Sequence, residues 1–384
     1  MKAETVIVGG GPAGAVAAWT LAKAGRVPLL LERETGPKPK ICGEFVSIEA
    51  QTVLRTVGVD PAALGAPAID RLRLVHDQRV AETALPFRAY GLTRRTMDEA
   101  LLDRAAAAGA EIRRGVTVRM IDGLRLATDD GEIEPDRLLL ASGKHDVRGA
   151  KRVSRGTVND LIGFKSYFRL AADQQAALGS HIEVLLFDGG YAGLQLVEGG
   201  MANLCLLVTP GAFARGGRSW PSLLTDLRTR CRHLDERLDS AAEMLDRPLT
   251  IAGLPYGFLY RPQATDLPHL YRAGDQVAVI PSFSGDGMAM AMVSGRAAAE
   301  AILEGRDARA HHDVMRAEFR RQIALAQAIY HLARPPALQP LIVEVARRWP
   351  GLATRLAAWT RVPSVYSSNR TAPSRSISDA SWVT

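Results

Sequence analysis

A glycine-rich turn near the amino terminus constrains the fold of this chain more than any other feature. The run "ETVIVGGGPAGAVAAWTLAKAG" reads as a buried strand, a tight turn and an alanine-rich helix, and "VPLLLERE" then forms the next strand. Gly9, Gly11 and Gly14 fit the pattern G-x-G-x-x-G. The first glycine permits the turn, the second lets a pyrophosphate approach the backbone, and the third lets helix and strand pack closely. The sequence therefore predicts a βαβ unit that binds a dinucleotide.

Two further features of this unit fit a dinucleotide. The helix after the turn offers unpaired N–H groups and a partial positive charge to the phosphates. Glu32 ends the second strand, eighteen residues beyond Gly14, where a carboxylate can accept hydrogen bonds from the ribose hydroxyls of adenosine. The alternative is an ordinary tight turn in an α/β domain, which does not account for an acid in this register.

The composition of the chain is typical of a globular protein. Its 384 residues are 47% hydrophobic and 23% charged, enough for a large core, and we expect two interleaved domains. No apolar run is long enough to span a bilayer and the start does not read as a signal peptide, so the expected location is cytoplasmic. Cys42, Cys205 and Cys231 lack the spacing of a zinc site or a disulfide framework, and we expect no metal.

The formal net charge of +7 comes from arginines scattered along the chain. Because no nucleic-acid-binding motif accompanies them, no nucleic-acid partner is expected. An attraction to anionic substrates or to the phosphates of a membrane surface stays open as an alternative.

A second glycine-rich stretch lies far along the chain. In "YRAGDQVAVIPSFSGDGMAMAMVSGRAAAEAI", Gly274 and Asp275 stand at a strand end, and a helix of small residues follows. Combined with the first turn, this stretch resembles the flavoproteins of the p-hydroxybenzoate hydroxylase fold, which include aromatic hydroxylases, flavin-dependent halogenases and geranylgeranyl reductases. The resemblance implies FAD as the cofactor, with Asp275 on its ribitol chain. It also implies that Pro281 and the turn from Gly285 to Gly287 face the isoalloxazine ring.

Further FAD contacts follow from the same resemblance. The segment "RRTMDEALLDRA" matches the family's R-x-x-D helix, which implies a place for Arg95 near the ribityl and phosphate groups. A helix that begins at Gly287 would aim its N–H groups and positive dipole end at the negative charge of reduced flavin. The residues implied to bind FAD are Gly9, Gly11, Pro12, Ala13, Gly14, Glu32, Arg33, Cys42, Gly43, Arg95, Gly143, Gly274, Asp275, Pro281, Gly285, Gly287 and Met288.

The loop "PKPKICGEF" follows the second strand and contains one of the three cysteines. Its Cys42-Gly43-Glu44 is similar to the Cys-Gly-Glu segment that lies near the flavin in geranylgeranyl reductases, so the loop is expected to line the flavin pocket. Cys42 would then be a proton donor or a substrate contact, with its pKa lowered by Lys40, and Glu44 and Tyr191 are further catalytic candidates. The alternative is that Cys42 packs as a small apolar residue.

The sequence also departs from the patterns of this fold family. Ser142 stands where many members carry an aspartate in a central Asp-Gly segment, which puts direct use of a nicotinamide cofactor in the hydroxylase manner in doubt. Electrons would then come from a separate reductase, another carrier or the substrate itself. The tryptophan-rich segment of the halogenases is absent. The stretch "GGYAGLQLV" resembles a strand of the geranylgeranyl reductases, but Ala192 and Gly193 replace an aromatic residue and would widen a pocket.

The expected fold is α/β, with a Rossmann-like FAD-binding domain of the p-hydroxybenzoate hydroxylase type interleaved with a β-sheet substrate domain. The FAD-binding domain would comprise residues 1–61, 92–154 and 263–310, and the substrate domain residues 62–91 and 155–262. A helical segment at 311–362 and a tail at 363–384 would follow. Within these, "WPSLLTDLRTRCRHLDERL" is expected to form one helix, and His311 and His312 are expected at the surface.

The function that these features favour is an FAD-dependent oxidoreductase. It would transfer a hydride between flavin N5 and a carbon of a hydrophobic small molecule, of an isoprenoid or polyketide-like kind, because apolar strands such as "ANLCLLV" would roof the pocket. Two alternatives stay open: a flavin-dependent monooxygenase that hydroxylates an aromatic ring, and a flavin carrier without turnover.

Overall fold

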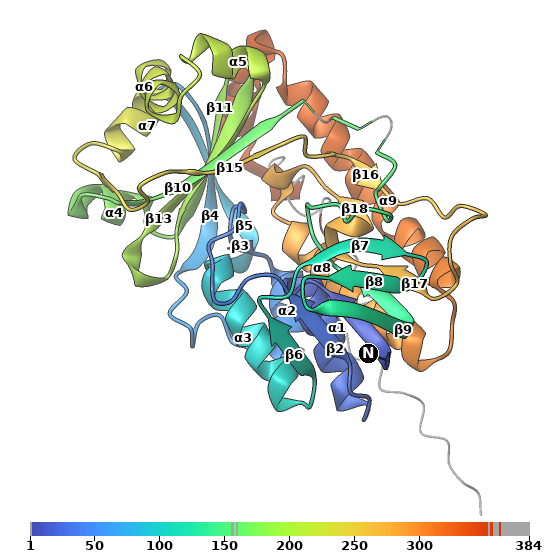
Figure 1. Cartoon of the computed structure of the whole chain (residues 1–384). Helices are drawn as coiled ribbons and strands as arrows, with labels where there is room; N and C mark the ends of the chain where they lie inside the picture. Colours follow the sequence, from blue (N-terminus) through green and yellow to red (C-terminus); the bar gives the residue numbers. More distant parts are fainter. Residues whose placement is uncertain (1, 155–156, 159, 352–353, 356–360, 362–384) are drawn as a thin grey trace, which may run out of the picture.

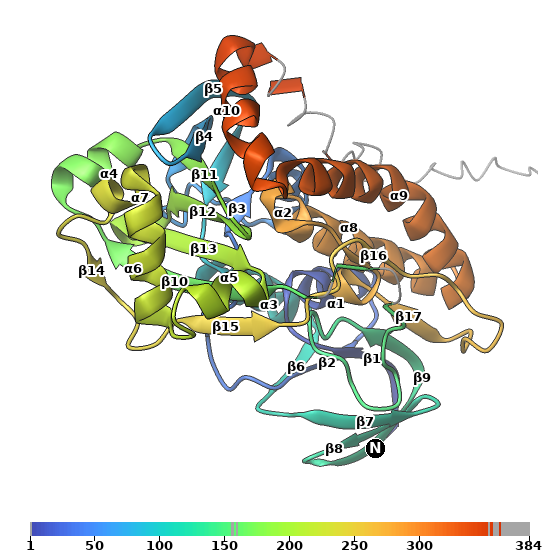
Figure 2. The same cartoon turned by 90° about the horizontal axis from the view of Figure 1, so that it is seen from above.

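The structure is a computed structural model that describes residues 2–154, 157–158, 160–351, 354–355 and 361 (Figure 1). The tail expected at 363–384 lies outside the described residues. Two sheets organise this part of the chain, and they lie beside each other with helices around them (Figures 1 and 2).

The first sheet contains the predicted βαβ unit and is mainly parallel. Its strands follow the order β6-β2-β1-β9, and β17 pairs with the end of β9, all of these in parallel. The first part of β9 continues into an antiparallel ribbon with β8 and β7. The strands are β1 (Lys2–Val8), β2 (Leu29–Glu32), β6 (Glu111–Arg114), β7 (Val118–Asp122), β8 (Arg125–Thr128), β9 (Gly131–Leu140) and β17 (Leu270–Arg272).

Both faces of the parallel sheet are covered, which explains why its strands read as continuous apolar runs. Ile7, Leu30 and Leu139 pack on one face against helices, whereas Val6 and Val8 pack on the other face against the ribbon. The helices are α1 (Pro12–Lys23), α3 (Arg94–Ala107) and α8 (Gly287–Leu303), and α2 (Ile48–Val57) packs beside α8.

The second sheet is mostly antiparallel and extends away from the first. Its order is β14-β10-β13-β12-β11-β4-β5-β3, with β15 on β10. The strands are β3 (Phe45–Val46), β4 (Ala68–His76), β5 (Arg79–Gly91), β10 (Ile162–Arg169), β11 (His181–Phe187), β12 (Gly190–Leu196), β13 (Ala202–Val208), β14 (Ala242–Glu243) and β15 (Leu249–Ala252); a separate pair joins β16 (Phe258–Leu259) and β18 (Ala278–Val279).

One face of the second sheet is apolar and packs against α4 (Ala172–Leu178), α5 (Pro210–Arg215), α6 (Trp220–Arg230) and α7 (Arg232–Arg237). The expectation of one helix from Trp220 onward is wrong, because Cys231 adopts an extended conformation (φ −128°, ψ 93°) that separates α6 from α7. Side chains alternate along a strand, so the other face of this sheet carries a different set of residues and looks toward the first sheet.

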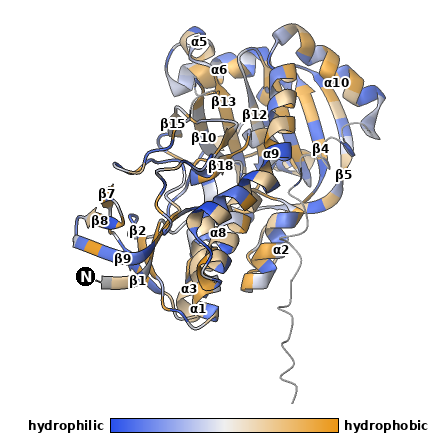
Figure 3. Ribbon diagram, turned by 90° about the vertical axis from the view of Figure 1, so that its right-hand side faces the viewer, coloured by the Kyte–Doolittle hydropathy of each residue, from blue (hydrophilic) through white to orange (hydrophobic). Residues whose placement is uncertain are grey.

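The carboxyl-terminal part contains α9 (Ala308–Ala333) and α10 (Gln339–Arg348). Helix α9 packs along α8 and β17, and α10 packs on β4 and β5 (Figure 3). Val343 of α10 forms a buried hydrophobic cluster with Ala81 and Leu186. The expectation that His311 and His312 are at the surface is wrong. Both are 1% exposed, because His312 Nε2 accepts from the Arg272 N–H (3.0 Å) and His311 Nε2 bonds the Arg272 carbonyl (2.9 Å).

Among the described residues, no helix is long and apolar enough to cross a membrane.

Candidate active site

The turn between β1 and α1 has the close packing that its glycines predict. Gly9 has φ +107°, and a Cβ atom at Gly14 would lie 1.9 Å from the Gly9 carbonyl oxygen. Pro12 and Ala13 begin α1, and Gly11, at its N-cap, forms no side-chain cap. The first N–H groups of the helix are therefore open to a phosphate.

Glu32 closes the end of this turn. Its carboxylate accepts from the Gly10 N–H (2.7 Å) and from the Glu34 N–H (3.0 Å), and it is 6% exposed. This position at the end of β2 is the one expected for a carboxylate that binds an adenosine ribose. Arg33, the next residue, is exposed and pairs with Glu34 (3.2 Å), so its side chain lies outside the turn.

The arginine beside the phosphate turn is Arg94 rather than Arg95. The Arg94 guanidinium holds Asp98 through two hydrogen bonds of 2.7 and 2.9 Å, and a Cβ at Gly11 would lie 3.3 Å from it. Arg95 is exposed, although both arginines border a small cavity beside Gly10 and Glu32. The R-x-x-D pattern pointed to Arg95, but residues three and four before Asp98 both lie on its side of a helix, and the contact with Asp98 is made by Arg94.

The second glycine-rich segment touches the first. A Cβ at Gly274 (φ +63°) would lie 3.2 Å from Ala13 Cβ, and a Cβ at Gly295 of α8 would lie 2.1 Å from the Ala13 carbonyl oxygen. The Gly274 N–H also donates to Ser294 of α8 (2.8 Å). Two segments more than 250 residues apart in the chain therefore form one cradle.

Asp275 fits the role of ribitol ligand. Its side chain is half-buried, and among the described residues its carboxylate has neither a hydrogen bond nor an ion pair. Its backbone is fixed instead, because Arg152 donates to the Asp275 carbonyl (2.7 Å). Gly143 has φ +65° and accepts from Gln276 (2.8 Å), which places the loop after β9 beside this segment.

The turn before α8 is tightly packed. Pro281 and Met288 are buried, and Gly285 has φ +74° with a hypothetical Cβ only 2.6 Å from the Phe45 ring. Helix α8 then begins at Gly287, after the buried Asp286. Helix α8 packs along α1.

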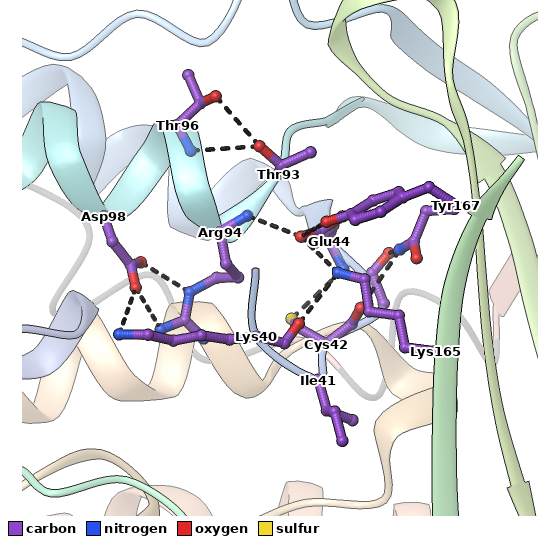
Figure 4. A network of polar contacts seen from close by, with 12 residues as sticks. Lys40, Ile41, Cys42, Glu44, Thr93, Arg94, Thr96, Asp98, Lys165 and Tyr167 are labelled. Atoms are coloured by element: carbon purple, nitrogen blue, oxygen red, sulfur yellow. Dashed lines mark hydrogen bonds and ion pairs between the residues drawn. The ribbon is translucent and has the colours of Figure 1, made fainter. Parts of the chain in front are cut away.

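The loop from Lys40 to Glu44 is held by side chains from other segments (Figure 4). Lys165 donates to the Lys40 carbonyl (3.0 Å) and Lys144 to that of Ile41 (2.7 Å). Asn203 then donates to the carbonyls of Cys42 (3.3 Å) and Gly43 (2.8 Å), and Gln195 donates to that of Glu44 (2.9 Å). Each successive carbonyl has a side-chain donor, so this loop is fixed against the second sheet. No sequence pattern predicts these donors, because three of them lie on strands of the second sheet and Lys144 lies in the loop after β9, all far from this loop along the chain.

Glu44 is the centre of this network (Figure 4). It has φ +60° and no exposed surface. Lys165 Nζ lies 2.5 Å from Glu44 Oε1, and the Tyr167 hydroxyl and the Arg94 N–H each donate to the same oxygen at 2.8 Å. Burial raises the pKa of Glu44, and Lys165, Arg94 and Tyr167 oppose that rise. Lys165 is itself fully buried, so the two residues form an internal ion pair.

The face of the second sheet that bears Lys165 also bears Cys205, Gly193 and Tyr191. Cys205 stands opposite Lys165 on one side and Gly193 on the other. Tyr191 bonds Ser282 (2.6 Å), just before the turn that starts α8, so this face meets the second glycine-rich segment.

Cys205 and Tyr191 are half-buried. Burial raises the pKa of Cys205 to about 11 and also raises the pKa values of Tyr191 and Tyr256. These groups therefore keep their protons at neutral pH. Within the described ranges, no cluster of three or more histidine, cysteine or acidic side chains could hold a metal ion.

Comparison with known proteins agrees with this geometry. Residues 2–149 match the family described as FAD binding domain. The chain is 27% identical to digeranylgeranylglycerophospholipid reductase 2 of Methanopyrus kandleri, over 79% of this chain and 78% of that protein. It is also 27% identical to the menaquinone reductase of Mycobacterium tuberculosis, over 90% of this chain and 88% of the relative. A flavin-dependent brominase has the same fold, with a TM-score of 0.76 at 18% identity over 94% of this chain and 93% of the other.

The α1 turn, Glu32 and the open Asp275 fit an FAD molecule, and the sequence similarity runs through both glycine-rich segments. The chain is an FAD-dependent oxidoreductase of the p-hydroxybenzoate hydroxylase fold, with geranylgeranyl reductases and menaquinone reductases among its relatives.

Proposed function

We propose that this protein is an FAD-dependent reductase that saturates a carbon–carbon double bond of a hydrophobic isoprenoid compound. Bound FAD, once reduced by an electron donor, would supply a hydride from N5, and the chain would supply a proton, an orientation and a dry pocket. The names of its relatives, a digeranylgeranylglycerophospholipid reductase and a menaquinone reductase, support a substrate with an isoprenoid chain.

The observation that carries the proposal is the electrical neutrality of the inner face of the second sheet. Beside Cys205 on this face, the positive charge of Lys165 is matched by Glu44 at 2.5 Å. Cys205 and Tyr191 stay protonated because burial raises the pKa of each. An apolar chain can enter such a surface without leaving an ion unpaired, whereas an ionic substrate group would have to displace the existing pair.

Space for the substrate is available at Gly193. A Cβ at this position would meet its nearest atom, the Cys205 carbonyl oxygen, at 3.9 Å. Gly193 does not have a positive φ, so its backbone would accept a side chain without strain. We propose that the missing side chain leaves room on the inner face for a bulky substrate.

Cys42 is the proton donor in this proposal. It is half-buried, and its Sγ accepts from the Glu44 N–H (3.3 Å), which fixes the thiol at the rim of the rigid loop. Glu44, a catalytic candidate from the sequence, has no exposed surface and three donors on one oxygen. We assign Glu44 to positioning of the loop, and Tyr191 to contact with the substrate from the neighbouring strand.

The test uses protein reduced in the absence of oxygen. Geranylgeranyl diphosphate or a menaquinone is added, and the return of the yellow oxidised flavin is followed together with the mass of the organic product. The proposal predicts reoxidation that requires the isoprenoid compound, and a product whose isoprenoid chain, rather than its quinone ring, gains two hydrogens for each bond reduced.

Two other outcomes would contradict the proposal. A product that gains an oxygen atom, and only after oxygen is admitted, would identify a monooxygenase. Reduced flavin that no isoprenoid compound reoxidises, in protein that binds FAD fully, would favour a carrier.

A further inference from the structure

A buried carboxylate stands at the start of α8, in the turn of the FAD site. Asp286 is 0% exposed, and neither of its oxygens accepts a hydrogen bond from the described residues. Although it occupies the N-cap position, it makes no side-chain cap. An ionised carboxylate in such a place is costly unless a cation compensates it.

The compensating cation comes from the carboxyl-terminal segment. Arg361 Nη1 lies 3.0 Å from Asp286 Oδ1 and 3.8 Å from Glu49 of α2, and Arg361 Nη2 donates to the Ser284 carbonyl (2.7 Å). The guanidinium also lies over the ring of Phe87 in β5, 4.7 Å from its centre. Its side chain is 12% exposed.

These contacts connect three parts of the molecule. Ser284 and Asp286 belong to the turn that positions α8, Glu49 lies on α2 beside α8, and Phe87 belongs to the second sheet. A planar guanidinium suits this place, since its several N–H groups and its flat face can bind a carboxylate, a carbonyl and a ring together.

We propose that Arg361 is a positioning residue of the FAD site, which holds the turn from Ser284 to Gly287 by neutralising Asp286 and joins that turn to β5. The first turn of α8 then keeps its N–H groups directed to the flavin. This inference rests on FAD binding alone, so it stands or falls independently of the proposed substrate.

The first test is the affinity of the apoprotein for FAD at about pH 9, well above the pKa of about 7 that Asp286 has beside Arg361. Arg361→Gln should weaken binding by about tenfold or more, because it leaves the Asp286 charge buried without its partner. Arg347→Gln is the matched control. Arg347 also lies in the carboxyl-terminal segment, but it pairs with Glu344 at the surface of α10 and should leave the affinity unchanged.

The second test asks whether the effect passes through Asp286. In the double variant Asp286→Asn with Arg361→Gln, no buried charge is left over, so FAD should bind more tightly than in Arg361→Gln alone. The same rescue should follow from lower pH. With Arg361 present the pKa of Asp286 is raised to about 7, because burial raises it most, Arg361 opposes that rise and Glu49 adds to it; loss of Arg361 should raise this pKa further. Protonation of Asp286 at about pH 6 should therefore shrink the defect of Arg361→Gln.

Wild-type affinity in Arg361→Gln, measured beside the control, would overturn the proposal. So would losses that simply add in the double variant, or a defect that does not change with pH. If Arg361→Gln does not fold, the double variant decides: folding with restored FAD binding supports the proposal, and failure to fold while Asp286→Asn alone folds refutes it.

Discussion

Substitution of Lys165 by methionine tests the internal ion pair that fixes the flavin-side loop. Lys165 and Glu44 have no exposed surface, and Nζ and Oε1 are 2.5 Å apart. Methionine keeps most of the volume of lysine but removes its charge, so the change isolates electrostatics from packing. The Glu44 carboxylate would keep two donors, the Tyr167 hydroxyl and the Arg94 N–H.

The size of the effect follows from what is lost. Removal of one partner of a buried ion pair costs about 3–5 kcal/mol of unfolding free energy, because the other charge stays buried. The Lys40 carbonyl also loses its hydrogen bond from Lys165, worth about 1 kcal/mol. At about neutral pH, Lys165→Met should therefore lower the free energy of unfolding by about 4–6 kcal/mol.

The loss should also depend on pH. Burial raises the pKa of Glu44 above its ordinary value of 4.5, and Lys165 opposes that rise. Without Lys165, folded protein keeps the Glu44 proton to higher pH than the unfolded chain does. Stability is then full below the unfolded pKa and falls as pH rises through the folded pKa. The gap between Lys165→Met and wild type should widen with increasing pH.

Urea unfolding across a series of pH values measures this gap. Lys144→Met is the matched control, because Lys144 also donates to a loop carbonyl, that of Ile41 at 2.7 Å, but has no ion-pair partner among the described residues. It should cost about 1 kcal/mol with no such pH dependence. Lys165→Met that costs no more than the control, or a loss that stays constant with pH, would refute the reasoning.

Three further predictions concern packing, catalysis and acid stability. Gly295→Ala should lower the unfolding temperature, since its Cβ would lie 2.1 Å from the Ala13 carbonyl oxygen. Gly193→Ala should not, because its Cβ would lie 3.9 Å from the nearest atom, the Cys205 carbonyl oxygen. Equal melting curves for the two variants would count against the α1–α8 contact. Cys42→Ser should slow isoprenoid-dependent flavin reoxidation by about 100-fold or more, measured at saturating FAD, and an unchanged rate would remove the thiol from the mechanism. Burial lowers the pKa of His312 from 6.5 to about 2, so the stability that neutral His312 contributes is lost as pH falls below 6.5. His312→Asn should therefore make the unfolding temperature fall less steeply as pH is lowered. A fall as steep as that of wild type would contradict this.

The elements that bind FAD could be predicted because local rules govern them. Gly9, Gly14 and Glu32 follow from a strand, a turn and a helix within one short stretch, and backbone geometry forces the residue types. The small residues of α8, Gly295 among them, also signalled close packing. The same rules do not separate Arg94 from Arg95, since the two are adjacent at the start of α3 and differ in which side of the helix they occupy.

The residues that fix the loop from Lys40 to Glu44 could not be predicted. Lys165 lies in an alternating strand pattern that is equally typical of a solvent-exposed lysine, and its partner Glu44 lies more than a hundred residues earlier. Only the register of β10, β13 and β12 places Lys165, Cys205 and Gly193 beside one another. The burial of His312 has the same origin, because the backbone of β17 supplies its hydrogen-bond donor.

The central claim is that the two glycine-rich segments bind one FAD molecule together, and a titration of apoprotein with FAD tests it most directly. The account predicts saturation at one FAD per chain. Asp275→Asn should weaken binding by about tenfold or more, through loss of a charge-assisted hydrogen bond, whereas the surface control Asp188→Asn should not change it. Absence of saturable uptake, or equal affinities for wild type and Asp275→Asn, would contradict it.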